Sequence, residues 1–151
     1  MSENSIIVTW EEHFATGITF LDNQHKELIS LTNSLYQACL SGDESVGVAF
    51  KEAMGKMVNY VRFHFSAELD LLRKIKYPAY KNHKSEHDYL IKQILNAAKE
   101  YDKGKKFVPH QFVRTLKDWV FSHIAFTDKL YSTYVAEQVQ KGLLNTKDLV
   151  G

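Results

Sequence analysis

The chain has 151 residues, of which 44% are hydrophobic, and its 19 basic and 18 acidic side chains leave a formal net charge of +1. That balance gives no reason to expect nucleic acid or an anionic membrane as a partner. No apolar run approaches the length needed to span a bilayer, and the first residues lack a secretory-signal pattern, so we expect one soluble, cytoplasmic domain over residues 1–151.

Two long helices are predicted in the first half of the chain, after an extended N-terminal arm over 1–19. Apolar side chains at steps of three and four mark one buried stripe over 20–40 and another over 45–74. Pro78 ends the second helix, because proline lacks an amide donor and disfavours helix in the residue before it.

Two further helices are predicted in the second half. The third covers about 80–103, and the fourth begins near Pro109, a favourable first-turn residue. Residues 135–151 are expected to form a short helical tail. Because the connections are short, neighbouring helices should run antiparallel. The predicted fold is therefore all-α, an up-down-up-down four-helix bundle over 20–134.

Histidine and carboxylate side chains recur on the stripes that face the predicted core. Residues four apart lie on one face of a helix, so pairs at that spacing project together. A lone histidine on such a stripe is usually a core residue satisfied by one hydrogen bond. Here every helix carries one, and ionised carboxylates are costly to bury unless they are paired or bind metal. The set that the four helices would bring together is His25, His64, Glu68, His83, His87, His123 and Asp128.

This donor set restricts the metal chemistry. Seven protein ligands are too many for one tetrahedral zinc ion, and there is no thiolate cluster for an iron–sulfur centre. Imidazoles with carboxylates suit iron and, by geometry alone, manganese, zinc or copper. Two metals bridged by both carboxylates and a solvent-derived oxide would use the set well. Three histidines would complete six ligands on one metal, and two would leave the other metal with five and an open position.

One spacing departs from the simple rule. His123 and Asp128 are five residues apart, which is roughly 140° around a regular helix. Either the fourth helix is locally widened there or Asp128 reaches sideways; a single wide turn is known at functional sites. Two other histidines, His13 and His110, have no partner at ligand spacing and are expected on the surface.

The motifs around these residues resemble the hemerythrins, and more closely their bacterial single-domain form, over about 10–131. The similar stretches are LDNQHKEL at 21–28, HFSAE at 64–68 and HKSEHD at 83–88, together with Trp10, Tyr77-Pro78 and residues 119–128. The resemblance implies two non-haem iron ions with an oxo or hydroxo bridge. By the family's pattern, one iron is six-coordinate and the other has the open position, where dioxygen binds reversibly. The six-coordinate iron would be held by His83, His87 and His123, the other by His25 and His64, and Glu68 and Asp128 would bridge the two.

The resemblance also implies an apolar dioxygen pocket over the open iron. A dry wall slows the loss of bound oxygen, because water and protons cannot reach it. Ordinary core packing is the alternative role, and the two roles are compatible. The candidates, all within a turn of a ligand, are Leu28, Phe65, Trp119, Val120 and Ile124.

The expected function is a dioxygen carrier or store and not an enzyme. Its partners would be dioxygen and an unidentified oxygen-consuming protein. One alternative is a di-iron oxidase or peroxide-handling enzyme, but oxygen-activating bundle sites usually carry more carboxylate, in Glu-x-x-His pairs. The other alternative is an oxygen or redox sensor. Sensor forms in the family are commonly fused to signalling modules, for which 151 residues leave no room.

Overall fold

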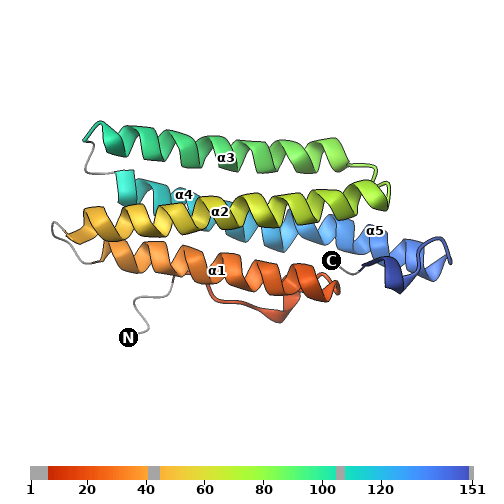
Figure 1. Ribbon diagram of the computed structural model, residues 1–151. Helices are drawn as coiled ribbons and strands as arrows, with labels where there is room; N and C mark the ends of the chain where they lie inside the picture. Colours follow the sequence, from red (N-terminus) through yellow and green to blue (C-terminus); the bar gives the residue numbers. More distant parts are fainter. Residues whose placement is uncertain (1–6, 41–44, 105–107, 150–151) are drawn as a thin grey trace.

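The computed structural model describes residues 7–40, 45–104 and 108–149 (Figure 1). Within these ranges the chain is helical and has no strand. The π-helical segment His123–Thr127 joins α4 to α5, so that the three form one continuous fourth helix. The α-helices are α1 (Thr19–Cys39), α2 (Ser45–Lys74), α3 (Tyr80–Asp102), α4 (Val108–Ser122) and α5 (Asp128–Gln140).

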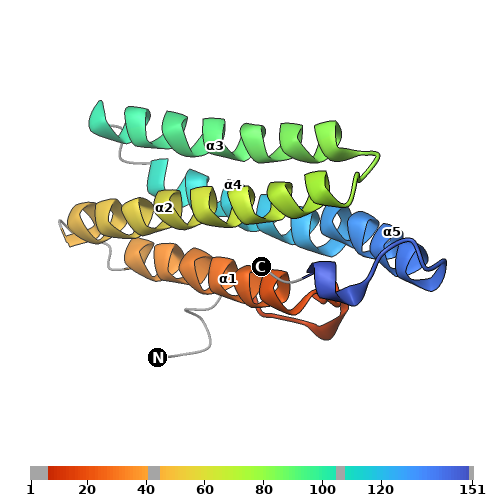
Figure 2. The same cartoon turned by 45° about the vertical axis from the view of Figure 1, so that its right-hand side comes forward.

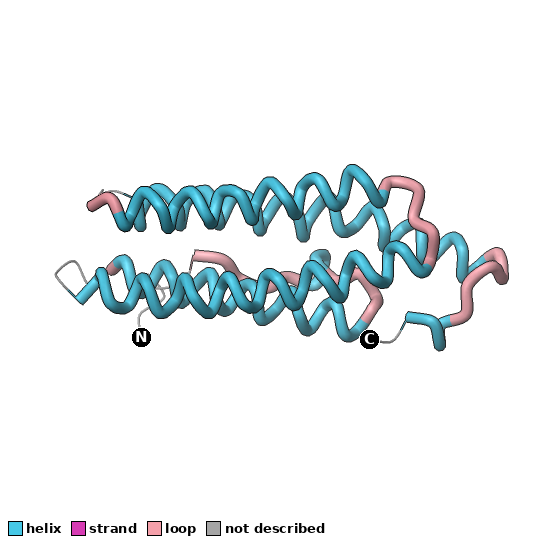
Figure 3. The backbone as a smooth tube through the Cα atoms, turned by 45° about the horizontal axis from the view of Figure 1, so that its top comes forward, coloured by secondary structure: helices cyan, strands magenta, loops and turns pink. Residues whose placement is uncertain are grey.

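The helices form an antiparallel bundle. The end of α1 and the start of α2 lie at the same end of the molecule, as do the end of α3 and the start of α4 (Figure 1). Each helix packs against two neighbours: α1 against α2 and α4, and α3 against α2 and α4. Figure 3 shows the helices running along one another. The predicted four-helix bundle is therefore confirmed.

The turn between α2 and α3 shows why the second helix ends where its sequence predicts. Lys76 adopts a left-handed conformation with φ of 56°. The Tyr77 amide then donates to the Leu72 carbonyl at 2.9 Å, which satisfies a carbonyl at the helix end. Pro78 follows and prevents the helix from resuming at once.

Apolar side chains form two separate buried clusters. On α2, Phe65 belongs to the larger cluster and Leu71 to the smaller one, and Glu68 lies between them. On α1, His25 likewise lies between the two clusters, with Leu21 in the smaller one and Leu28 in the larger one. A polar centre thus divides the core. The larger cluster includes Leu28, Leu35, Phe50, Met57, Val61, Phe65, Leu90, Leu116, Val120 and Ile124, and the smaller cluster is Ile18, Leu21, Leu71, Leu72, Ile75, Tyr77, Tyr131 and Val135.

The described start of the N-terminal arm is held against α1 by the side chain of Asn33. The amides of Ile7 and Val8 both donate to Asn33 Oδ1 at 3.0 Å, and Asn33 Nδ2 donates to the Val8 carbonyl at 2.8 Å. Phe14, at the end of the arm, is buried in the larger cluster. Specific contacts thus hold the described part of the predicted arm on the bundle.

The C-terminal tail covers the end of the bundle at the smaller cluster. Helix α5 continues to Gln140, past residue 134 where the bundle was expected to end. The chain then turns back beside the bundle (Figure 2), and Leu144 and Leu149 pack against the smaller cluster. Among the described residues, no helix is both long and apolar enough to cross a membrane.

Candidate metal centre

The polar centre contains all seven side chains that the spacing predicts. The structure places His25 on α1, His64 and Glu68 on α2, and His83 and His87 on α3. His123 begins the π-helical segment and Asp128 begins α5. Each of the seven is at most 2% exposed. Burying this many polar groups without a cation is costly, because each loses its hydration.

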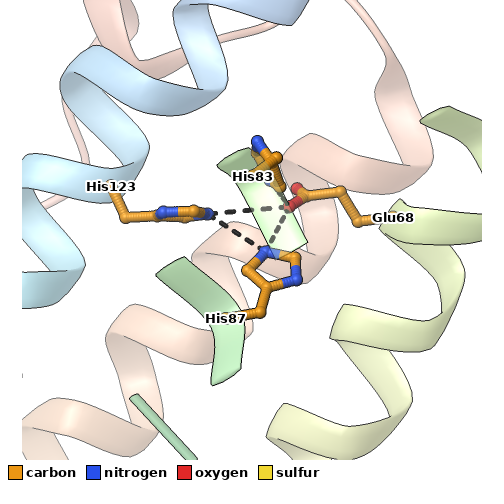
Figure 4. Close-up of side chains that lie close together, drawn as sticks. All are labelled: Glu68, His83, His87 and His123. Atoms are coloured by element: carbon orange, nitrogen blue, oxygen red, sulfur yellow. Dashed lines mark hydrogen bonds and ion pairs between the residues drawn. The ribbon is translucent and has the colours of Figure 1, made fainter. Parts of the chain in front are cut away.

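Glu68 lies between two groups of histidines. One is the three-histidine group, which consists of His83, His87 and His123; the other is the two-histidine group, which consists of His25 and His64. Glu68 Oε1 lies 2.6, 2.9 and 3.7 Å from the Nε2 atoms of His83, His87 and His123 (Figure 4). Glu68 Oε2 lies 3.1 Å from Nε2 of His25 and 3.5 Å from Nε2 of His64. Each carboxylate oxygen thus faces one group.

Asp128 repeats this division. Its Oδ1 lies 3.0 Å from His123 Nε2 and 3.4 Å from His83 Nε2, both in the three-histidine group. Its Oδ2 lies 3.0 Å from His25 Nε2, in the two-histidine group. Neither oxygen makes a hydrogen bond of acceptable geometry within the described part of the chain, and the same is true of His64 Nε2. These buried, unsatisfied donor and acceptor atoms are what a bound cation would satisfy.

The distances define two sets of atoms that could each hold a metal ion. Ligand atoms of Glu68 and the three-histidine group lie within 4.8 Å of one another, and so do those of Glu68 and the two-histidine group. Glu68 belongs to both sets. Imidazole nitrogens with carboxylate oxygens are ligands that suit iron and other first-row divalent metals.

Without metal, the charges of the centre are balanced by protons. Burial alone would lower the pKa of His25, but the nearby Asp128 and Glu68 carboxylates outweigh it and raise this pKa to about 9. The same balance raises the pKa of His123 well above its ordinary value, chiefly through Asp128. Burial opposes ionisation of both carboxylates, yet the facing histidines hold their pKa values below the usual range. Two protonated imidazoles therefore neutralise two carboxylates.

Two other histidines of the centre, His64 and His87, stay neutral. Burial lowers the pKa of His64 to about 3, and it also lowers that of His87. Neutral imidazole is the form that binds a metal ion, so these two rings need lose no proton to do so. Metal binding should instead displace the protons on His25 and His123.

The π-helical segment explains the five-residue spacing between two of these side chains. The Asp128 amide donates to the His123 carbonyl, which is the wide pairing of a π-helix. One wide turn brings residues five apart to the same side, so both His123 and Asp128 face the centre. The first of the two alternatives drawn from the sequence, local widening, is confirmed.

Four residues that hold the centre from outside were missed by sequence reasoning. The His64 ring donates from Nδ1 to Gln24 Oε1 at 2.7 Å, and the His123 ring from Nδ1 to Glu86 Oε1 at 3.3 Å. Thr127 Oγ1 donates to the same Glu86 oxygen at 2.9 Å. Because these pairs join different helices, no spacing within one helix of the sequence predicts them.

Tyr131 is the fourth of these residues, and its spacing from Asp128 in the sequence could have predicted it. It lies three residues after Asp128, on the same side of α5. The Tyr131 side chain is fully buried, and its hydroxyl donates to Glu68 Oε2 at 3.1 Å. Burial raises the pKa of Tyr131 well above its ordinary value, so the hydroxyl keeps its proton.

Two of the five pocket candidates pack their rings against histidines of the centre. The Phe65 ring stacks on His87 with centroids 3.7 Å apart, and the Trp119 ring stacks on His123 at 4.3 Å. Both stacking contacts are with the three-histidine group, and Phe65 also lies near the two-histidine group, with its ring centroid 5.8 Å from that of His64. Leu28, Val120 and Ile124 are buried and Trp119 is partly exposed. These contacts establish a packing role, and the role in a dioxygen pocket stays a prediction.

The two histidines expected on the surface are there. His13 has a side chain 60% exposed and lies 3.5 Å from the Glu11 carboxylate, and His110 is exposed on α4. Both are therefore suitable reference positions for experiments on the buried histidines.

Comparisons with known proteins agree with this geometry. A family model described as the hemerythrin HHE cation binding domain matches residues 16–135. A bacteriohemerythrin of Methylococcus capsulatus is 30% identical over 126 residues, which cover 83% of this chain and 94% of that protein. A hemerythrin-like protein of Naegleria gruberi is 30% identical over 122 residues, covering 81% of this chain and 88% of that protein.

Solved structures give the same result. The crystal structure of a wild-type hemerythrin superposes with a TM-score of 0.75 at 29% identity, covering 83% of this chain and 95% of that one. A leucine-to-tyrosine mutant of hemerythrin superposes with a TM-score of 0.77, covering 85% and 96%. The chain belongs to the hemerythrin family.

Proposed function

We propose that this protein binds dioxygen reversibly at two non-haem iron ions, as a carrier or store. The observation that carries the proposal is the division of both carboxylates. One oxygen of Glu68 and one of Asp128 face the three-histidine group, and the other oxygen of each faces the two-histidine group. Two carboxylates that each offer one oxygen to either side would bridge two metal ions and hold them close together.

The unequal number of histidines supports an open position on one side. The three-histidine group would complete the coordination of its iron together with the bridges. The two-histidine group would supply one ligand fewer, and that iron would have room for dioxygen. When bound, the iron pair supplies the two electrons that reversible binding of dioxygen requires.

The surroundings of the centre favour release of dioxygen over cleavage of its O–O bond. Among the described residues, Tyr131 is the only non-histidine side chain that donates a hydrogen bond to Glu68, and none donates to Asp128. Because burial holds the proton on Tyr131, it is a poor general acid. Leu28 and Ile124, each 1% exposed, exclude water from this region. The proposal includes delivery to an oxygen-consuming protein in the cytoplasm.

The test is an optical titration with dioxygen. Protein that has been loaded with ferrous iron under anaerobic conditions is exposed to air, and the oxygen is then removed. We expect visible absorption bands that appear and disappear over repeated cycles, with two irons per chain. His25→Ala should abolish these bands, whereas His13→Ala, which changes an exposed histidine, should leave them intact.

Two outcomes would contradict the carrier function. If an organic substrate is consumed with each dioxygen, the protein is an oxidase. If the ferrous form never returns when oxygen is removed, it is not a carrier.

A further inference from the structure

We propose that Glu86 is a positioning residue that holds the His123 ring and thereby strengthens metal binding at the three-histidine group alone. The inference rests on the proposed two-metal centre. It adds a physical reason for the two positions to differ in metal affinity. It depends on two features of the rings: which nitrogen of each ring points away from Glu68, and which residue accepts a hydrogen bond from that nitrogen.

The orientation of the rings identifies the free nitrogen. All five histidines direct Nε2 toward Glu68, at distances from 2.6 to 3.7 Å. A metal in the centre would therefore bind Nε2, and each neutral ring would carry its proton on Nδ1. The residue that accepts a hydrogen bond from Nδ1 then fixes the orientation of the ring. It also sets how strongly the Nε2 lone pair binds a metal ion.

One ring in each histidine group has such a partner. In the two-histidine group, His64 Nδ1 donates to the amide oxygen of Gln24 at 2.7 Å. In the three-histidine group, His123 Nδ1 donates to the carboxylate of Glu86 at 3.3 Å. The Nδ1 atoms of His25, His83 and His87 have no hydrogen-bond partner among the described residues. The partner is thus neutral on one side and negatively charged on the other.

Glu86 is itself held in place. It lies on α3 immediately before His87, and Thr127 Oγ1 donates to its two oxygens at 2.9 and 3.2 Å. Thr127 is the last residue of the π-helical segment that begins with His123. Glu86 therefore ties α3 to the segment that carries His123. Trp119 covers the face of the same ring at 4.3 Å, so that both the edge and the face of the ring are fixed.

The charge of Glu86 makes the effect specific to one metal position. A carboxylate that accepts an imidazole N–H increases the basicity of the opposite nitrogen more than an amide does. His123 should then be the stronger metal ligand. His64, whose ring is hydrogen-bonded to Gln24, should be the weaker one. Loss of such an outer partner lowers metal affinity about 10- to 100-fold in other metal sites.

The experiment is a titration of metal-free protein with cobalt(II), followed by its visible absorption. The wild-type chain should bind two equivalents. Glu86→Gln keeps the shape of the side chain and removes its charge, so it should weaken one equivalent about 10- to 100-fold and leave the other unchanged. Gln24→Glu, the converse change, should strengthen the other equivalent. Asp88→Asn is the matched control, because Asp88 lies on the same helix, is 59% exposed and pairs with Lys84 at the surface.

A spectroscopic measurement separates this role from general loss of structure. In the cobalt-loaded protein, paramagnetically shifted proton resonances report the imidazole N–H groups. We expect Glu86→Gln to shift one exchangeable resonance and to speed its exchange with solvent, and Asp88→Asn to shift none. Thr127→Val should produce a smaller change in the same resonance.

The inference is overturned if Glu86→Gln binds both equivalents as the wild type does, or if both weaken together. It also fails if the wild-type chain binds fewer than two equivalents. Because the titration uses no dioxygen, failure of reversible oxygen binding alone would refute the carrier function and leave the role of Glu86 standing.

Discussion

The smaller apolar cluster and the polar centre are neighbours in the same bundle, and both are closed to solvent. Glu68 and Leu72 lie one turn apart on α2, and each has a relative exposure of 0%. Leu72 is surrounded by side chains such as Leu21 and Tyr131 and needs nothing from outside the chain. Glu68 is surrounded by imidazoles, and its charge must be compensated by protons on those rings or by metal cations.

This difference divides the sources of stability. Apolar burial contributes about 25 cal/mol per Å² whether or not metal is present. Burying a charge costs several kcal/mol unless it is well paired. The two clusters should therefore maintain the bundle without metal, and the binding of cations by the polar centre should add further stability.

The largest expected effect comes from Glu68→Ala. The variant removes the carboxylate that contacts both histidine groups, so both metals should be lost. A ligand at a thousand times its dissociation constant stabilises a protein by about 4 kcal/mol, and this contribution should disappear. Metal analysis and melting curves with and without chelator measure it. Two metals per chain with an unchanged melting temperature would contradict the bridging role.

Leu72→Ala is the converse experiment in the smaller cluster. The cavity left by a fully buried leucine should destabilise the protein by about 2–5 kcal/mol. The loss should be similar in the metal-free and metal-loaded forms, measured by urea unfolding, and two metals should still bind. Loss of metal from this variant would show that the cluster and the centre are not independent.

The stability of the metal-free protein should fall as pH rises from about 6.5 to 9. The carboxylates raise the pKa of His25 to about 9 and also raise that of His123. Over this range the folded protein binds more protons than the unfolded chain, so increasing pH favours unfolding. The slope is about 1.4 kcal/mol per pH unit for each fully protonated group.

Urea midpoints at a series of pH values test this prediction. The metal-loaded protein serves as the control and should show no such slope, because metal replaces those protons. A flat or rising stability of the metal-free form over the same range would be inconsistent with protonated histidines beside the carboxylates.

Polar substitutions at Leu28 or Ile124 should act on kinetics more than on metal content. Each side chain is 1% exposed, next to the two-histidine and three-histidine groups respectively along its helix. Serine at either position would admit water and speed irreversible oxidation of the oxygenated protein. The rate can be followed by the decay of the visible bands. Unchanged decay in both variants would argue against their role in the pocket.

The smallest effect is expected for Tyr131→Phe. The change removes one hydrogen bond to Glu68 Oε2 and leaves the aromatic ring in the smaller cluster. A destabilisation of about 1 kcal/mol is typical for such a bond, and two metals should still bind. Thermal melting and metal analysis provide the measurements. Loss of one metal would instead make Tyr131 essential for orienting Glu68.

Much of this molecule could be predicted from local sequence patterns. Helical periodicity predicted the bundle, and Pro78 predicted the end of α2. Placing histidines and carboxylates on inner stripes correctly predicted that the seven side chains converge, because each stripe faces the same core. The end of the fourth helix was less clear, since apolar residues become sparse after Val135 and the spacing no longer defines a face.

Contacts between helices were beyond the reach of such patterns. Gln24 and His64 are 40 residues apart, and Glu86 and His123 are 37 apart. Only the packing of the bundle determines which of many polar side chains meets a given ring. The spacing of His123 and Asp128 likewise shows a mismatch with a regular helix, but it does not show whether the backbone or the side chain absorbs that mismatch.

The most direct test of the two-metal centre is a crystal structure of the iron-loaded protein with diffraction measured at the iron absorption edge. We expect two anomalous peaks inside the bundle, one bound by His83, His87 and His123 and the other by His25 and His64, with Glu68 and Asp128 contacting both. A single peak, or a peak that only one of the two carboxylates contacts, would contradict the bridged pair.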